Sequence, residues 1–153
     1  MSIFLVRHAK AGSRSSWEGD DLLRPLSPNG WKQAQSLAKR LRKEGVTTLS
    51  SSPYLRCRQT LEPLGALLDL DVRDDERLRE GEPFDGAIDL LGSVADGAVL
   101  CSHGDVIPET IAALQRRGCA ISMPADWRKA TVWTIERSAD GEFLSAVVTP
   151  PPA

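Results

Sequence analysis

The chain is poor in the residues that build disulfide frameworks and thiolate metal sites. Its 153 residues include three cysteines, two histidines and one tyrosine. Cys57, Cys101 and Cys119 are odd in number, widely spaced and without a CxxC pair, which argues against a disulfide scaffold and against a zinc site built on thiolates. We therefore expect buried, reduced thiols.

Long apolar runs and an excess of either charge are also missing. No segment approaches the roughly 20 apolar residues that span a bilayer, and the N-terminus lacks a signal-peptide pattern, so we expect a cytoplasmic protein with no membrane partner. The formal net charge is -2, which argues against a nucleic-acid partner, so any basic site must be local. The length predicts a single domain over residues 1–153.

The order of apolar and amphipathic segments predicts the fold class. Short apolar runs, typical of strands buried on both faces, alternate with segments of helical periodicity. This order predicts an α/β protein whose central sheet is mostly parallel, with helices on both faces and an antiparallel hairpin at the end. We expect strands at 3–6, 46–52, near 72 and at 97–102, helices at 26–45, 53–70, about 87–91 and 105–118, and a hairpin within 130–148.

Both histidines follow predicted buried strands. His8 follows residues 3–6, and His103 follows 97–102; each precedes a small residue, and Arg7 precedes His8. Because ligands of parallel α/β sheets bind beyond the carboxyl ends of the strands, we expect both imidazoles at one sheet edge. Arg56 or Arg58, early in the next helix, offers a third positive group, and the sequence alone does not choose between them.

Imidazoles and guanidiniums at one sheet edge suit phosphoryl transfer. Arginine binds phosphate oxygens bidentately and stays charged, and a neutral histidine can attack phosphorus and form a phosphohistidine. The leaving oxygen needs a proton, and a carboxylic acid can supply it. Glu80 and Glu82 are both candidates for that acid. The polar segment 10–26 is long for a loop in a compact domain, which is typical of functional loops.

Two other classes compete with a phosphatase. A metal-dependent hydrolase would use both histidines with a carboxylate such as Asp20 or Asp105, but an arginine beside a metal-binding histidine is electrostatically unfavourable. We therefore expect no metal and no cofactor. The third possibility is a non-catalytic module that binds a phosphorylated ligand or a protein partner.

Four segments, in this order, resemble the motifs of the histidine phosphatase superfamily, the phosphoglycerate mutase-like proteins: "LVRHAKAG", "SSPYLRCRQT", "RLRE" and "VLCSHGDVI". The resemblance implies a three-layer α/β/α fold. It also implies that His8 is the nucleophile and that Arg7, Arg56 and His103 complete the phosphate pocket, with Gly104 following in the second histidine motif. Glu80 would be the acid, and no metal would be needed.

Two groups within this superfamily are especially similar to the chain. Its length resembles the small SixA-type phosphohistidine phosphatases, whereas the string "RHAKAGSR…W.GDD..RPLS" resembles the histidine phosphatase domain of actinobacterial Nudix (MutT-type) fusion hydrolases. The second resemblance makes Lys10, Arg14 and Lys129 candidate substrate contacts. We expect a phosphoric monoester hydrolase acting on a small phosphorylated metabolite or nucleotide; the alternative substrate is a phosphohistidine protein.

Overall fold

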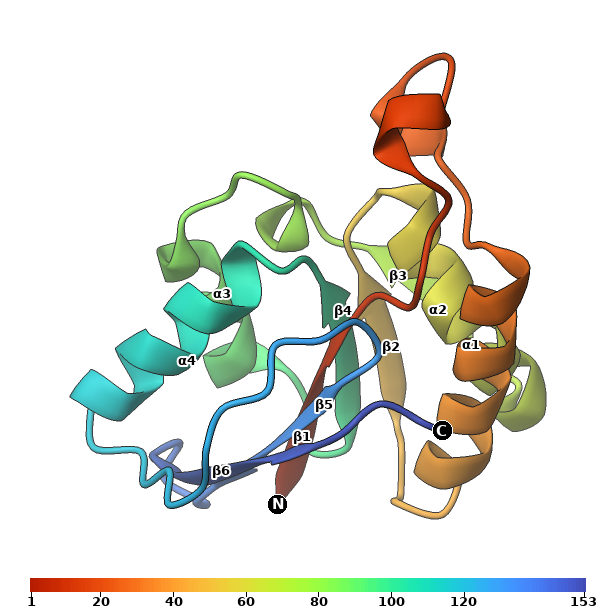
Figure 1. Cartoon of the computed structure of the whole chain (residues 1–153). Helices are drawn as coiled ribbons and strands as arrows, with labels where there is room; N and C mark the ends of the chain where they lie inside the picture. The colour runs from red at the N-terminus through yellow and green to blue at the C-terminus, as the bar shows by residue number, and fades with distance from the viewer.

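The centre of the molecule is a six-stranded sheet, seen in a computed structural model that describes all 153 residues (Figure 1). The strand order is β3-β2-β4-β1-β5-β6, in which β3, β2, β4 and β1 run parallel and β5 pairs antiparallel with both β1 and β6. The predicted mostly parallel sheet with a terminal hairpin is therefore confirmed. The strands are β1 (Ser2–Arg7), β2 (Thr48–Ser51), β3 (Val72–Asp74), β4 (Ala98–Ser102), β5 (Val132–Arg137) and β6 (Phe143–Thr149).

Four α-helices cover the two faces of this sheet. Strand residues alternate between two cores, so that Phe4 and Val6 pack with one pair of helices while Ile3 and Leu5 pack with the other pair. Because both faces are covered, the buried strands read as continuous apolar runs in the sequence. The three-layer prediction is confirmed by α1 (Pro28–Leu41) and α2 (Leu55–Leu68) on one face, and by α3 (Phe84–Ser93) and α4 (Val106–Arg116) on the other.

The start of α1 fixes the chain that leaves β1. Ser27 caps the helix by accepting a hydrogen bond from Gly30 N at 3.1 Å, and Pro28 occupies the first turn. Gly30 lies so close to Lys10 that a Cβ atom here would be 1.8 Å from the Lys10 carbonyl oxygen. The segment just after β1 is thus packed tightly against the start of α1.

The polar segment 10–26 projects beyond the carboxyl ends of the strands (Figure 1). It contains two short 3-10 helices, Arg14–Ser16 and Asp21–Leu23, and an antiparallel bridge between Ala11 and Leu26 closes its base. The segment therefore has local structure of its own at the edge where the strands end.

Two expectations about the whole chain can also be compared with the structure. Cys57, Cys101 and Cys119 are all buried free thiols, as predicted. None of the helices combines the length and the apolar character that crossing a membrane requires.

Candidate active site

The two histidines meet at the carboxyl ends of neighbouring strands. His8 directly follows β1, His103 follows β4, and the strands are parallel with Arg7 opposite Ser102. The two ring centroids lie 5.5 Å apart in an edge-to-face arrangement. Each side chain is buried, and each residue comes directly after a strand inside the sheet, so the paired strands fix where it begins.

The hydrogen bonding of His8 defines which of its ring nitrogens is free. Its Nδ1 lies 2.8 Å from the carbonyl oxygen of Ala9. Because a carbonyl oxygen can only accept, Nδ1 carries the proton, and Nε2 of the neutral ring keeps its lone pair. Burial lowers the pKa of His8 well below its usual value. The hydrogen bond to Ala9 O opposes this shift, and electrostatic repulsion from the neighbouring His103, Arg56 and Arg7 adds to it. The ring is therefore neutral at neutral pH and has a free Nε2.

Arg7 is held beside His8 by the backbone around it. Its Nη1 donates to the carbonyl oxygen of Trp127. Its guanidinium also lies flat against Gly104, where a Cβ atom would be 2.6 Å from Arg7 Cζ. Gly104 therefore contributes by having no side chain, because any larger residue would displace the guanidinium.

The structure places Arg56, and not Arg58, at the histidines. Arg56 is completely buried near the start of α2, with Nη1 3.0 Å from Asp21 O and Nη2 3.1 Å from Asp21 Oδ2. Its guanidinium carbon lies 4.8 Å from the centre of the Tyr54 ring. Arg58 instead pairs with Asp74 and is partly exposed.

Asp21 is the counter-ion of this buried guanidinium. Its Oδ1 accepts from Nε of the buried Arg24 at 2.8 Å. Desolvation works to raise the pKa of Asp21, but hydrogen bonds and charges from Arg24 and Arg56 outweigh it and lower the pKa below its usual value. Asp21 therefore stays ionised at neutral pH.

His103 is held in its orientation by residues of α2 and of the segment between β2 and α2. Its Nε2 lies 2.8 Å from the hydroxyl oxygen of Ser52 and 3.5 Å from the sulfur of Cys57. The Tyr54 ring packs against its face, edge to face, with centroids 4.8 Å apart. These contacts fix one ring nitrogen and leave the other, Nδ1, for a different partner.

Unpartnered buried nitrogens gather at this place. Four buried side-chain nitrogens in the protein lack a hydrogen-bond partner, and three of them are Arg7 Nε, Arg56 Nε and His103 Nδ1; the fourth is Trp133 Nε1. A buried polar group without a partner costs on the order of 1–3 kcal/mol. Their concentration around His8 fits a ligand that is rich in acceptor oxygens, such as a phosphoryl group.

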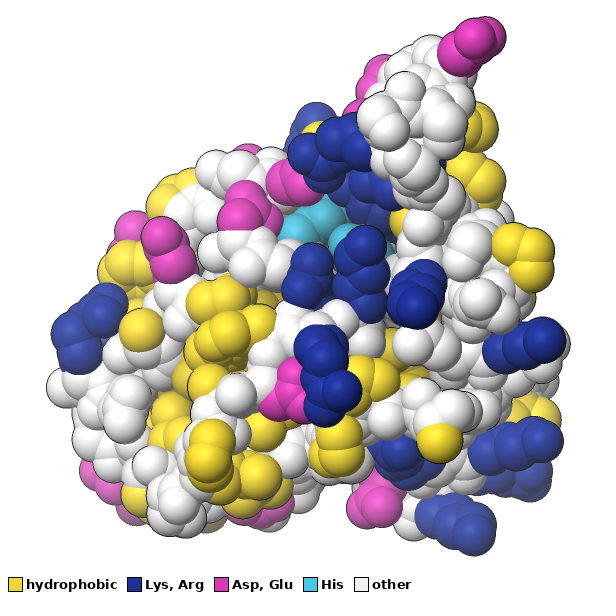
Figure 2. All heavy atoms as spheres, viewed as in Figure 1, with side chains coloured by type: hydrophobic (Ala, Val, Ile, Leu, Met, Phe, Trp, Pro, Cys, Tyr) yellow, Lys and Arg dark blue, Asp and Glu magenta, His cyan; other side chains and the backbone are white.

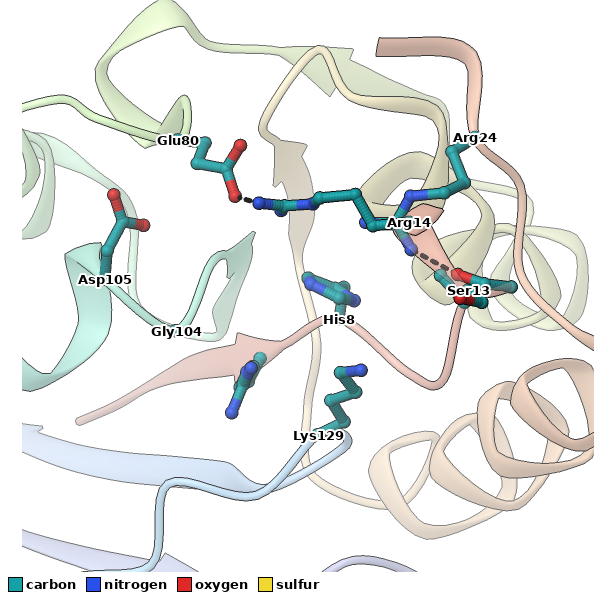
Figure 3. A pocket seen from close by; sticks show the side chains of 11 residues that line it. His8, Ser13, Arg14, Arg24, Glu80, Gly104, Asp105 and Lys129 are labelled. Carbon is teal, nitrogen blue, oxygen red and sulfur yellow. Dashed lines mark hydrogen bonds and ion pairs between the residues drawn. The ribbon is translucent and has the colours of Figure 1, made fainter. Parts of the chain in front are cut away.

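A pocket of about 330 Å³ opens above His8. Figure 2 shows histidine atoms at the bottom of a hollow that is bordered by lysine and arginine side chains and, on one side, by acidic side chains. Figure 3 shows His8 at the centre of the pocket, with Glu80 and Lys129 on opposite sides of it. Only one of the eleven lining residues is hydrophobic; they are Arg7, His8, Ala11, Gly12, Ser13, Arg14, Arg24, Glu80, Gly104, Asp105 and Lys129.

Glu80 lies at the rim, between two guanidiniums. Its Oε1 is 2.9 Å from Arg14 Nη2 and 3.5 Å from Arg56 Nη2. The next residue, Gly81, donates its N–H to Asp105 Oδ2 at 2.7 Å, which ties the loop to the start of α4. Glu82, the other candidate acid, does not line the pocket.

The three candidate substrate cations occupy different positions. Arg14 and Lys129 line the pocket, and Arg14 is already paired with Glu80. Lys10 does not line it; it lies in a neighbouring depression that also includes Lys129. Proximity in the sequence to His8 therefore does not place Lys10 over the same pocket.

Residues that sequence reasoning did not single out include Asp21, Arg24 and Ser13, all in the polar segment 10–26. The only sequence signal for them was that this segment is polar and long for a loop, which is typical of functional loops. The carboxylates considered for a metal site are placed otherwise: Asp20 accepts from Leu22 N, and Asp105 from Gly81 N. No three His, Cys, Asp or Glu side chains are grouped as metal ligands.

We expect the imidazole of His8 to stay neutral at pH values where an exposed histidine is mostly protonated. Since the folded-state pKa is lowered, the unfolded chain binds a proton below about pH 6.5 that the folded protein does not. The free energy of unfolding should therefore fall as the pH drops below this value. NMR titration of the two imidazoles checks the pKa, with His8→Asn to assign the signal and to remove the pH-dependent loss of stability. A His8 midpoint at or above the usual value contradicts the assignment.

Comparison with known proteins supports the resemblance to the histidine phosphatase superfamily. Residues 3–85 match the family model of the histidine phosphatase superfamily (branch 1). Among curated proteins, the 8-oxo-(d)GTP phosphatase of Mycolicibacterium smegmatis is 34% identical over 157 aligned residues, which cover 99% of this chain and 48% of that protein. A probable phosphoglycerate mutase GpmB of Serratia proteamaculans is 33% identical over 84 residues, covering 52% of this chain and 38% of that protein. The chain thus spans about half the length, or less, of these relatives.

Solved structures share the fold over nearly the whole chain. The protein histidine phosphatase SixA in complex with tungstate has a TM-score of 0.77 at 21% identity, covering 99% of this chain and 96% of that one. A SixA protein from Nakamurella multipartitia has a TM-score of 0.76 at 26% identity, with the same coverage. From its motifs, their meeting at one sheet edge and the family match, the chain belongs to the histidine phosphatase superfamily.

Proposed function

We propose that the protein is a phosphoric monoester hydrolase that works through a covalent phosphohistidine on His8. The observation that carries this proposal is the neutral His8 ring, with a free Nε2, beside Arg7, Arg56 and His103, each of which has a buried nitrogen without a hydrogen-bond partner. Phosphoryl transfer relies mainly on positioning and on stabilising charge on three oxygens. Several fixed donors around one nucleophile meet both needs.

In the first step, the lone pair of His8 Nε2 forms a bond to phosphorus while the bond to the leaving oxygen breaks. The phosphoryl oxygens accept hydrogen bonds from Arg7, Arg56 and His103. The leaving oxygen takes the bonding pair and a proton from Glu80 and departs as an alcohol. Glu80 lies 3.5 Å from the Arg56 guanidinium, which would also hold the phosphate, so its carboxyl group is beside the position proposed for the phosphoryl group.

In the second step, water attacks the phosphohistidine. Glu80, now a carboxylate, removes the proton of this water, the P–N bond breaks, and the electron pair returns to Nε2. Orthophosphate leaves, and the enzyme is restored. No metal ion enters either step.

The substrate we propose is a small phosphorylated metabolite or nucleotide. Cations at the rim of the pocket, among them Lys129, suit an anionic small molecule. The name of the Mycolicibacterium smegmatis relative describes a nucleotide as its substrate, although that protein is about twice as long. The alternative, a phosphohistidine protein, is favoured by the likeness to SixA over nearly the whole chain.

Brief incubation with ³²P-labelled phosphate esters should leave label on His8. The label should be stable in alkali and lost in acid, as a phosphoramidate is, and should be absent from His8→Ala. The same panel ranks substrates, since it includes nucleotides, sugar phosphates and a phosphohistidine protein. If the phosphohistidine protein is the only substrate that is hydrolysed, the small-molecule assignment is overturned.

The control for this trapping experiment is a chelator, which should leave turnover unchanged. If the wild type shows neither turnover nor label with any substrate of the panel, and His8→Ala binds ligand as well as the wild type does, the domain is instead a binding or interaction module.

The role of Glu80 can be tested through the leaving group. Glu80→Gln should slow hydrolysis of an alkyl phosphate about 100-fold or more, because general acid catalysis contributes roughly 10²–10⁴-fold. It should slow p-nitrophenyl phosphate much less, since that leaving group departs without a proton. Glu82→Gln is the matched control and should behave like the wild type. Equal losses on both substrates would contradict an acid role for Glu80.

A further inference from the structure

A second depression adjoins the proposed catalytic pocket. It encloses about 440 Å³ and is lined by Arg7, Lys10, Gln33, Arg128, Lys129 and Pro151. Arg7 and Lys129 line both spaces, so the two are separated by no more than a pair of side chains. Figure 2 shows lysine and arginine side chains gathered beside the histidines.

The two sides of the site differ in how their cations are neutralised. On the Glu80 side, Arg14, Arg24 and Arg56 each form an ion pair with Asp21 or Glu80. In the second depression, Arg128 pairs with Asp126 at 2.6 Å, whereas Arg7, Lys10 and Lys129 have no carboxylate partner. Three positive charges therefore face one space without an ion pair of their own, although the charge of Asp105 acts on Arg7.

Lys10 is exposed, yet its backbone is fixed. Its N–H donates to Gln33 Oε1 at 3.0 Å, and its carbonyl oxygen accepts from Ser27 N at 3.0 Å. The close contact with Gly30 leaves no room for the backbone to move toward α1. The Lys10 side chain, which lines the depression, therefore extends from a backbone that is held in place.

Lys129 is positioned by a strained residue. Ala130, buried and just before β5, has a φ of 65°, in the left-handed region that alanine rarely adopts. Its N–H donates to the carbonyl oxygens of both Arg7 and His8, at 3.1 and 3.2 Å. Such strain persists only where the surroundings enforce it, and it concentrates at functional sites.

The charge on Lys129 is costly in the absence of an anion. Burial lowers its pKa below the usual value, and the charges of Arg7, Arg24, Arg56 and Lys10 lower it further. An anion bound between Lys10 and Lys129 would reverse this effect.

We propose that Lys10, Lys129 and Arg7 form a second anion subsite, which binds a second phosphate group adjacent to the one transferred to His8. The substrate would then be a small organic diphosphate. This inference rests on the proposed function and extends it from a phosphate monoester to the terminal anhydride bond of a diphosphate. The Nε2–P bond forms at the terminal phosphorus, the anhydride P–O bond breaks, and the electron pair stays on the bridging oxygen. That oxygen belongs to the departing monophosphate, whose added charge faces the two lysines.

Selectivity between matched substrates tests the subsite. The ratio of kcat/KM for a nucleoside diphosphate to that for its monophosphate should be about 10 or more in the wild type. Lys10→Gln and Lys129→Gln should each lower this ratio about tenfold, which corresponds to the loss of about 1.4 kcal/mol. Lys43→Gln, which removes an exposed lysine beyond the end of α1, should keep the wild-type ratio.

A binding measurement separates the subsite from the chemistry. Methylenebisphosphonate carries two phosphonates and methylphosphonate one, and neither is hydrolysed. The wild type should bind methylenebisphosphonate more tightly than methylphosphonate, and Lys10→Gln and Lys129→Gln should each reduce this preference, as they reduce the kinetic ratio. This dependence in a protein that forms no phosphohistidine would support the subsite and reject the proposed function.

Phosphohistidine formation with ratios that the lysine variants leave unchanged would support the proposed function and overturn the subsite. Preference for a phosphorylated carboxylic acid or for a phosphohistidine protein over the diphosphate would also overturn it.

Discussion

The site depends on keeping several positive groups together around one neutral imidazole. Arg56 is completely buried, and the other guanidinium beside His8, Arg7, is partly buried. Burying a charge is costly unless it is paired and hydrogen-bonded. Asp21 provides that pairing for Arg56, and it comes from the polar segment that projects over the sheet edge. Burial, together with these positive charges, lowers the pKa of His8 and keeps its ring neutral.

Rigidity comes from the centre of the sheet. β1 pairs with β4 on one side and with β5 on the other, so Arg7 and His8 leave a strand that is held at both edges. Local costs accumulate where this strand ends: three unpartnered nitrogens, an alanine in a left-handed conformation and a glycine against Lys10. Proteins commonly violate local rules at functional sites and compensate elsewhere. Here the compensation is the continuous apolar packing on both faces of the sheet.

The fold and the position of the histidines could be predicted because they follow from local patterns. Apolar runs and helical periodicity locate the strands and helices, and parallel strands bring His8 and His103 to one edge. Local pattern could not choose between Arg56 and Arg58, because both lie in the first turns of α2; burial separates them. The resemblance to the family chose Arg56, and the structure places it beside the histidines.

Long-range pairing was the part that the sequence could not supply. Arg14 and Glu80 are 66 residues apart, and nothing in either segment indicates that they meet. In the sequence, Lys10 is as good a candidate for a substrate contact as Arg14 or Lys129. In the structure, its backbone hydrogen bond to Gln33 of α1 holds it beside the second depression.

The central claim is that Arg7, Arg56 and His103 surround one phosphoryl position in front of His8. A crystal structure with vanadate, which mimics a phosphoryl group in transfer, tests this most directly. The account predicts vanadium bonded to His8 Nε2, with its equatorial oxygens accepting hydrogen bonds from both guanidiniums and from His103. Vanadate bound only at Lys10 and Lys129, or away from His8 altogether, would contradict it.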